Sequence, residues 1–346
     1  MKPALAHPCN THAGSRPSPR LQYGLTLTEV MIAITISLIL LAGVMQIFTG
    51  SRQTYRVQDN MARLQENGRF AIDFLSRDIR MADHWGCLKN TATLANNLTG
   101  NVSMGTVAGL AGTEGAGGAP DTITLATAVP SGIIVNTQMP NSSANIFTNS
   151  NAGLVNGGIV IVSNCSNGDI FQITQLPAGG GIQHNSGAGT PGNTFNYPSP
   201  TCPGSAHCLS ADYGPGAEIM DTQIVTYSIA SDGTNNNRPT LYRSASGMGV
   251  AAAAAQPLVE GVETMQILYG EDLDANRTAD RYVPANTAGL VMNNVVSVRI
   301  GLVLVTAENN LAATPQTYTF NGAPVTATDR RLRRVFSSTI QLRNRV

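Results

Sequence analysis

The longest apolar run of the chain lies near its N-terminus. Residues 25–48 read LTLTEVMIAITISLILLAGVMQIF and contain a single charged residue, Glu29. At a rise of about 1.5 Å per residue, a helix of this length crosses the hydrocarbon core of a bilayer, which is about 30 Å thick. Three basic residues and no acidic one precede the run. We therefore expect residues 1–24 to stay in the cytoplasm and the globular part of the chain to lie on the far side of the inner membrane.

Two simpler interpretations of this run are a cleaved secretory signal and an ordinary membrane anchor. A secretory signal usually has an apolar region of about 7–15 residues that ends at a small-residue cleavage site. This run is longer, and no A-x-A site closes it. An ordinary anchor has no need of a charge, and a carboxylate inside a spanning helix costs about 2.5–3.5 kcal/mol. Glu29 therefore indicates a function beyond anchoring.

After Phe48 the pattern becomes amphipathic and keeps a helical period. Charged residues occupy most of the surface, and apolar residues recur at spacings of three, four or seven. The apolar residues are Met61, Leu64, Ala71, Leu75 and Ile79. Because no proline occurs between Pro19 and Pro120, we expect one helix from about residue 25 to residue 83. Its apolar stripe should pack against a sheet.

Beyond Trp85 the period changes to two, which indicates strands. Strands are expected at 121–128, 132–137, 158–163, 169–176, 222–230, 239–244, 262–269, 295–306, 316–320 and 334–342. Stretches rich in Gly, Asn and Ser near 96–119, 138–157 and 178–215 are expected to be loops. The pattern predicts an α+β fold in which a long N-terminal helix packs on a large antiparallel β-sheet head.

Composition narrows the possible functions. The 346 residues include 21 Lys+Arg and 21 Asp+Glu, so the formal net charge is zero and only 12% of residues are charged. Residues 91–210 contain no Lys or Arg at all. We expect no nucleic-acid partner, because such a partner requires a basic surface. We interpret the basic cluster at Arg330, Arg331, Arg333 and Arg334 as a solvated strand edge, where cations block unwanted strand pairing.

Five cysteines are present, at positions 9, 87, 165, 202 and 208. If residues 1–24 are removed from the mature protein, Cys9 is lost with them, and the other four cysteines suffice for two disulfides in an oxidising compartment. The short loop between Cys202 and Cys208 favours a local pair, which would leave Cys87 with Cys165. Free buried thiols are the alternative.

The segment 272–280, DLDANRTAD, carries an oxygen-bearing side chain at every second position. Such a loop can wrap Ca²⁺, which takes about six to eight oxygen ligands. The candidate ligands are Asp272, Asp274, Asn276, Thr278 and Asp280. The loop departs from an EF-hand, because Arg277 replaces the turn glycine and Val283 replaces the bidentate glutamate. An Asx-rich turn between two strands is the alternative, and we expect no other cofactor.

No catalytic constellation is visible in the sequence. G-x-S-x-G, H-E-x-x-H and P-loop motifs are absent. Cys202, His207 and Cys208 lack a convincing fourth zinc ligand. We therefore do not expect an enzyme.

Gly24, the pentapeptide Leu25-Thr26-Leu27-Thr28-Glu29 and the apolar run that follows resemble the start of a type IV prepilin. The resemblance implies a type IV pilin-like fold, cleavage by a prepilin peptidase after Gly24, and methylation of the new amino terminus at Leu25. It also implies that Glu29 serves filament assembly by pairing with the amino terminus of a neighbouring subunit. Such a pair would satisfy both charges where water is scarce.

This resemblance divides the chain into four segments. Residues 1–24 would be the cytoplasmic leader, 25–48 the transmembrane and filament-core helix, 49–84 the amphipathic helix, and 85–346 the head. Before assembly the protein would lie in the inner membrane as a single-pass prepilin with its head in the periplasm. After assembly it would lie in the pilus at the cell surface.

The head resembles the PilW family of minor pilins. The similar segments are Trp85-Gly86-Cys87, Cys165 ahead of 169–174, and the stretches 259–270, 331–336 and 342–345. The resemblance implies a minor pilin of the complex that initiates the pilus or forms its tip. Its implied partners are other minor pilins, the major pilin, the prepilin peptidase, the inner-membrane assembly platform and, before assembly, inner-membrane lipid. A pseudopilin of a type II secretion system and a membrane-anchored periplasmic binding or hydrolytic protein are the alternatives.

Overall fold

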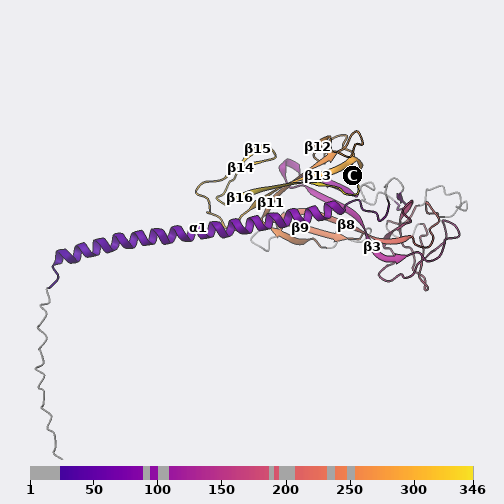
Figure 1. Cartoon of the computed structure of the whole chain (residues 1–346), viewed down its shortest axis with the longest axis horizontal. Coiled ribbons are helices and arrows are strands. Elements are labelled where there is room, and N and C mark those ends of the chain that lie inside the picture. Colours follow the sequence, from indigo (N-terminus) through magenta and orange to yellow (C-terminus); the bar gives the residue numbers. More distant parts are fainter. Residues whose placement is uncertain are drawn as a thin grey trace, which may run out of the picture. The chain divides into compact units, whose positions relative to one another are not determined.

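The computed structural model describes residues 24–88, 94–99, 109–186, 191–194, 207–231, 238–247 and 254–345 (Figure 1). The chain forms two compact units, Met1–Tyr55 and Arg56–Val346. Helix α1 (Leu27–Met81) passes from the first unit into the second as one element. The expected helix over 25–83 is therefore confirmed, and Gly43, Gly50 and Gly68 do not interrupt it.

In the second unit, one narrow face of α1 is buried. Its buried residues are Asn60, Leu64, Gly68, Ala71, Leu75 and Ile79. The ring of Phe336 lies where a side chain on Gly68 would be, since a Cβ there would come within 2.3 Å of the ring. The helix ends where Asp83 takes a left-handed conformation, with φ 61°.

The larger sheet has eight strands, which include most of the strands expected before residue 262. They are β1 (Leu94–Asn96), β2 (Leu110–Thr113), β3 (Thr122–Ile134), β5 (Ile159–Ser163), β6 (Gly168–Gln172), β8 (Glu218–Ser231), β9 (Pro239–Ser246) and β10 (Gln256–Glu260). The order is β1-β6-β5-β8-β3-β2, with β9 also paired to β8, and β10 to β9. All pairs are antiparallel except β1–β6.

The smaller sheet has the order β12-β11-β13-β16 and is antiparallel throughout. Its strands are β11 (Val262–Glu271), β12 (Arg281–Val283), β13 (Val295–Val305) and β16 (Arg333–Gln341). Two short ladders complete the described strands: β14 (Thr317–Phe320) with β15 (Ala323–Thr326), and β4 (Ile146–Phe147) with β7 (Gly181–Ile182). Two short 3₁₀ turns, at Ala116–Gly118 and Met292–Asn294, join strands.

The α+β fold with a long helix and a β-rich head is confirmed, but the head differs from expectation in detail. The head is built on two main sheets. The strands expected at 121–128 and 132–137 form a single strand, β3, because the ladder continues across a register shift between Pro130 and Ile133. Parts of the expected loops carry the short strands β2, β4 and β7, since two to four residues in these strands are too few for periodicity to reveal.

The main hydrophobic core joins α1 to both sheets. Leu64, Leu75 and Ile79 of the helix pack with Tyr227 of β8 and with the buried residues of β11 and β13. A second core lies within residues 133–219, around Phe171 and Tyr213. A third surrounds Trp85, beside the end of the helix. The expected apolar stripe of the helix therefore packs as predicted.

Two arginines form ion pairs in the interior of the head. Arg345 donates to Asp83 at 2.6 Å, and both side chains are at least 94% buried. Arg333 binds both oxygens of Glu263, at 2.7 and 2.8 Å, and also Asp329. The interpretation of Arg330–Arg334 as a solvated edge is wrong for Arg333, because this side chain is buried in an ion pair.

Candidate functional site

The N-terminal end of α1 is built around Thr26 and Glu29. The Thr26 carbonyl accepts the first helical hydrogen bond from Val30, at 3.2 Å, so Thr26 is the N-cap residue. Its hydroxyl accepts the Glu29 N–H at 3.3 Å, and Glu29 Oε2 accepts the Thr26 N–H at 3.0 Å. The Thr26 hydroxyl also lies 2.9 Å from Glu29 Oε2. The arrangement is a capping box.

The capping box places the carboxylate beside the expected cleavage bond. Gly24 and Leu25 precede the helix, are not helical and are exposed. Glu29 lies in the first turn of the helix, and its Oε2 accepts both bonds from Thr26. The sequence analysis identified Glu29 but missed the contribution of Thr26. The spacing Thr-x-x-Glu at the start of an apolar run was the signal that could have revealed it.

The first unit exposes its apolar side chains. Every residue from Gly24 to Arg56 is exposed, including Leu38 at 58% and Ile39 at 70%. Among the described residues, α1 is the one helix that is long and apolar enough to cross a membrane. A surface of this kind needs an apolar environment, which a bilayer or a bundle of like helices provides.

The cysteines of the head lie in disulfides as far as the structure describes them. Cys87 and Cys165 are bonded to each other, as expected, and link the segment after α1 to the turn between β5 and β6. Cys208 is buried and also disulfide-bonded. Cys202 lies outside the described residues, so the pairing of Cys202 with Cys208 stays a prediction.

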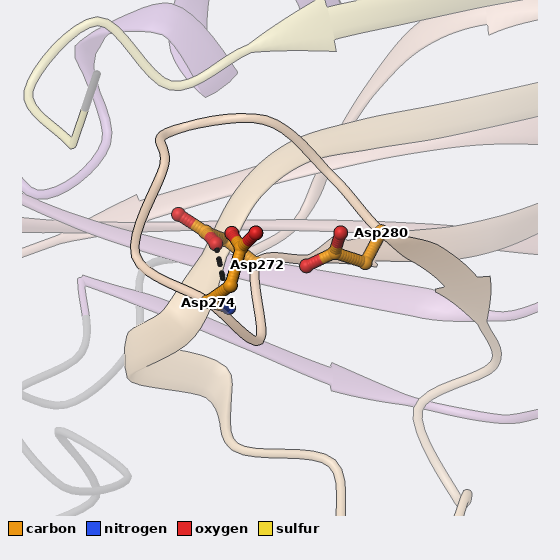
Figure 2. Close-up of side chains that lie close together, drawn as sticks. All are labelled: Asp272, Asp274 and Asp280. Atoms are coloured by element: carbon orange, nitrogen blue, oxygen red, sulfur yellow. Dashed lines mark hydrogen bonds between the residues drawn. The ribbon is translucent and has the colours of Figure 1, made fainter.

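The loop between β11 and β12 brings three of the five calcium candidates together. Oxygen atoms of Asp272, Asp274 and Asp280 lie within 4.8 Å of one another, and Figure 2 shows Asp280 reaching towards the other two from the far end of the loop. Asn276 contacts this group through its amide, which donates to Asp274 Oδ2 at 2.9 Å. Its side-chain oxygen accepts the Thr278 N–H at 2.8 Å and also contacts the Thr278 hydroxyl.

The same loop satisfies its own carboxylates. Asp272 accepts backbone N–H groups from Asp274, Asn276 and Arg277, the last at 2.7 Å. Burial raises the pKa of Asp272, but these hydrogen bonds outweigh it and hold the pKa below its ordinary value. These hydrogen bonds are those of an Asx-rich turn, which was the alternative to the calcium-binding interpretation. Calcium binding stays a prediction, which calorimetry of Ca²⁺ binding to the full chain, with Asp274→Ala as control, would test.

Sequence analysis also missed a buried carboxylate in the second core. Asp169 is fully buried and accepts hydrogen bonds from Asn97, Ser210 and Tyr213, the last at 2.6 Å. Burial, followed by the charge of Asp169, raises the pKa of the Tyr213 phenol far above its usual range. A tyrosine so difficult to ionise serves as a hydrogen-bond donor. The hydrogen bonds to Asp169 therefore join the segments around the second core.

Two family models match the chain, at its two ends. Residues 19–45 match the Prokaryotic N-terminal methylation motif, which includes Gly24, Thr26 and Glu29. Residues 226–344 match Type IV Pilus-assembly protein W, which spans the end of β8 and the whole smaller sheet. The chain therefore carries a PilW domain and a prepilin-type start, and it has a minor pilin role in type IV pilus assembly. The matched families are structural ones.

Comparison with whole proteins adds little to these matches. No protein of curated function matches the chain. Among solved structures, a type IV-like pilin from Thermus thermophilus is 12% identical, and the similarity covers 82% of this chain and 99% of that one, with a TM-score of 0.36. A TM-score this low leaves the fold to be judged from its own elements.

Proposed function

From a PilW domain joined to a prepilin-type start, we propose that this minor pilin combines with other minor pilins in the complex that initiates the pilus and remains at its tip. The protein is inserted in the inner membrane with its head in the periplasm. The prepilin peptidase removes residues 1–24 and methylates Leu25. The assembly platform then adds major pilin subunits to the membrane-proximal end of this complex.

The observation that supports this proposal is the position of Glu29. It is the single carboxylate of the exposed segment from Gly24 to Arg56, and it lies one turn from the bond that cleavage would break. Cleavage creates a cation at Leu25, next to a helix N-terminus whose dipole disfavours positive charge. A carboxylate from a neighbouring subunit can neutralise that cation in an apolar filament core. Removing one member of such a pair costs about 3–5 kcal/mol.

The experiment compares Glu29→Gln with Glu66→Gln in a deletion strain. Glu66 is an exposed carboxylate on the same helix, which makes it a matched control. We expect mass spectrometry to find N-methylated Leu25 as the mature N-terminus in the parent chain and in both variants. We expect pili to be few with Glu29→Gln and normal in number with Glu66→Gln.

Three results would contradict the proposal. An intact Met1 in the mature protein would favour a membrane-anchored periplasmic protein. Normal pili with Glu29→Gln would remove the role assigned to the carboxylate. A secretion defect in the deletion strain without loss of pili would favour a type II secretion pseudopilin.

A further inference from the structure

Strand β16 is an edge strand with one side unpaired. It pairs with β13 in nine consecutive positions without a register shift, and it pairs with no other strand among the residues that the structure describes. Two flanking bonds set the phase of the ladder: Leu342 N–H to Val296 O at 3.0 Å, and Thr306 N–H to Leu332 O at 2.9 Å. Because bonding alternates along an antiparallel pair, the even-numbered residues of β16 bond to β13. The odd-numbered residues direct N–H and C=O outward.

The first outward position is already occupied by a side chain. The amide of Gln316 accepts the Arg333 N–H at 2.7 Å and donates to the Arg333 carbonyl at 3.0 Å. This is the pair of bonds that a neighbouring strand would make. Beyond it, no described residue bonds the outward backbone groups of Val335, Ser337, Thr339 and Gln341. We call these four residues the β16 edge.

The β16 edge differs from the other sheet edges of the described head. β1 and β12 have three residues each and β2 has four, and β10 carries Pro257 beside a register shift. Short length, proline and bulges are the usual devices that prevent strand addition. β16 has nine residues, no proline and no bulge, and no charged residue lies between Arg334 and Arg343. Ser337, Thr339 and Gln341 are exposed.

Charge indicates what kind of strand would bind. Arg299, Arg334 and Arg343 surround the edge and are exposed, and none of them forms an ion pair with a described carboxylate. Arg299 lies over the ring of Tyr282, at 4.1 Å, and donates to the Thr339 hydroxyl at 3.4 Å. A second copy of this chain would bring arginines together, which is unfavourable across a strand pair. A strand with a carboxylate near Arg299 is favoured.

We propose that the β16 edge binds an extended, acidic segment of a neighbouring pilus subunit as an added strand of the smaller sheet. Main-chain hydrogen bonds at Val335, Ser337, Thr339 and Gln341 hold the segment, and Arg299 selects its carboxylate. The identity of the partner as a pilus subunit rests on the proposed function. The strand addition itself rests on the backbone and charge of β16.

The test uses the full chain in cells, with a photo-crosslinking amino acid at Gln341. We expect its adducts to map by mass spectrometry to one short segment of another pilus subunit that contains Asp or Glu. Thr339→Pro removes an outward N–H without breaking the β13 ladder, because proline is tolerated at the outward positions of an edge strand. It should lower the adduct yield about tenfold or more. The matched control Thr339→Val keeps the N–H and should keep the adduct.

A second variant covers the case in which Thr339→Pro accumulates poorly. Arg299→Glu leaves the β16 backbone unchanged and should reduce the adduct yield by repelling the acidic segment. The proposal would be overturned if Thr339→Pro and Arg299→Glu both kept the adduct yield of the parent chain. It would also be overturned by adducts to a second copy of this chain, or by the absence of any adduct in piliated cells. Failure of the proposed function is distinguishable. It would show as normal pili with Glu29→Gln, whereas failure at the edge would leave the Glu29→Gln defect in place.

Discussion

The two parts of helix α1 have the same backbone conformation and opposite surroundings. From Gly24 to Arg56 every residue is exposed, whereas beyond this segment one residue in every three or four is buried by the head. Residues 25–48 of the first part are predominantly apolar on every side, with Glu29 as their single charge, whereas the second part is apolar on one narrow face. The second part therefore stabilises its own fold. The first contributes only when a membrane or other subunits surround it.

The largest expected effect concerns the end of the second part. Arg345→Met leaves the Asp83 carboxylate buried without its cation, although Trp85 still donates to it at 2.6 Å. We expect the head to lose about 3–5 kcal/mol of unfolding free energy, measured by denaturant titration of the full chain in detergent. Arg343→Met, two residues earlier and exposed, is the control and should change stability little.

The next effect compares two leucines of the same helix. Leu75 is 0% exposed and Leu38 is 58% exposed. Leu75→Ala removes core packing and should destabilise the head by about 2–5 kcal/mol. Leu38→Ala should leave the unfolding midpoint of the head unchanged. Equal losses in the two variants would show that the apolar part packs within the same molecule, and the contrast between the two parts would be lost.

A smaller effect on stability is expected when a glycine of α1 is replaced by alanine, and its sign should be opposite in the two parts of the helix. Gly68→Ala would push against the Phe336 ring and should cost about 1–3 kcal/mol, less if the ring moves aside. A Cβ on Gly43 meets no atom within 4 Å, so Gly43→Ala should leave the head unaffected and strengthen the helix by up to about 1 kcal/mol. Denaturation of the head and helix content by circular dichroism separate the two results.

Much of this contrast was predictable from the sequence, because both parts of the helix have strong periodic signals. The apolar run, the stripe through Leu64 and Ile79, and the six strands expected from residue 222 onward were found at nearly their observed positions. The short strands β10, β12 and β15 were not expected. The capping box around Glu29 was also readable, although Thr26 was overlooked. Local patterns of this kind depend only on neighbours in the chain.

Features that depend on distant segments were not predictable. The division of the head into two sheets follows from pairings such as β3 with β8, which are far apart in sequence. Arg333 was expected to be solvated because its partner Glu263 lies in another strand, and no local pattern indicated that Asp83 pairs with Arg345. The unpaired side of β16 likewise emerges only when the strand order is known.

The smallest effect is a pH dependence that distinguishes the head, against which the second part of α1 packs, from the first part of α1, through one glutamate in each. Glu114 lies at the end of β2, where burial and then the charge of Asp121 raise its pKa. Asp121 accepts hydrogen bonds from Gly115 and Ile267, yet burial raises its pKa as well. Within the described part of the chain, no cation lowers the pKa of either carboxylate.

Because its pKa is raised in the folded state, Glu114 contributes fully to stability below the unfolded pKa of a glutamate, about 4.3. That contribution is lost as pH rises through the folded pKa. Glu114→Gln cannot ionise, so its stability relative to the parent chain should increase as pH rises from about 4 towards neutrality. Melting temperatures of both proteins across this range provide the measurement. Glu29→Gln is the control, because Glu29 lies in the part of α1 that the head does not bury. If Glu29→Gln changed the pH profile of the head as much as Glu114→Gln does, the two parts of the helix would not be energetically separate.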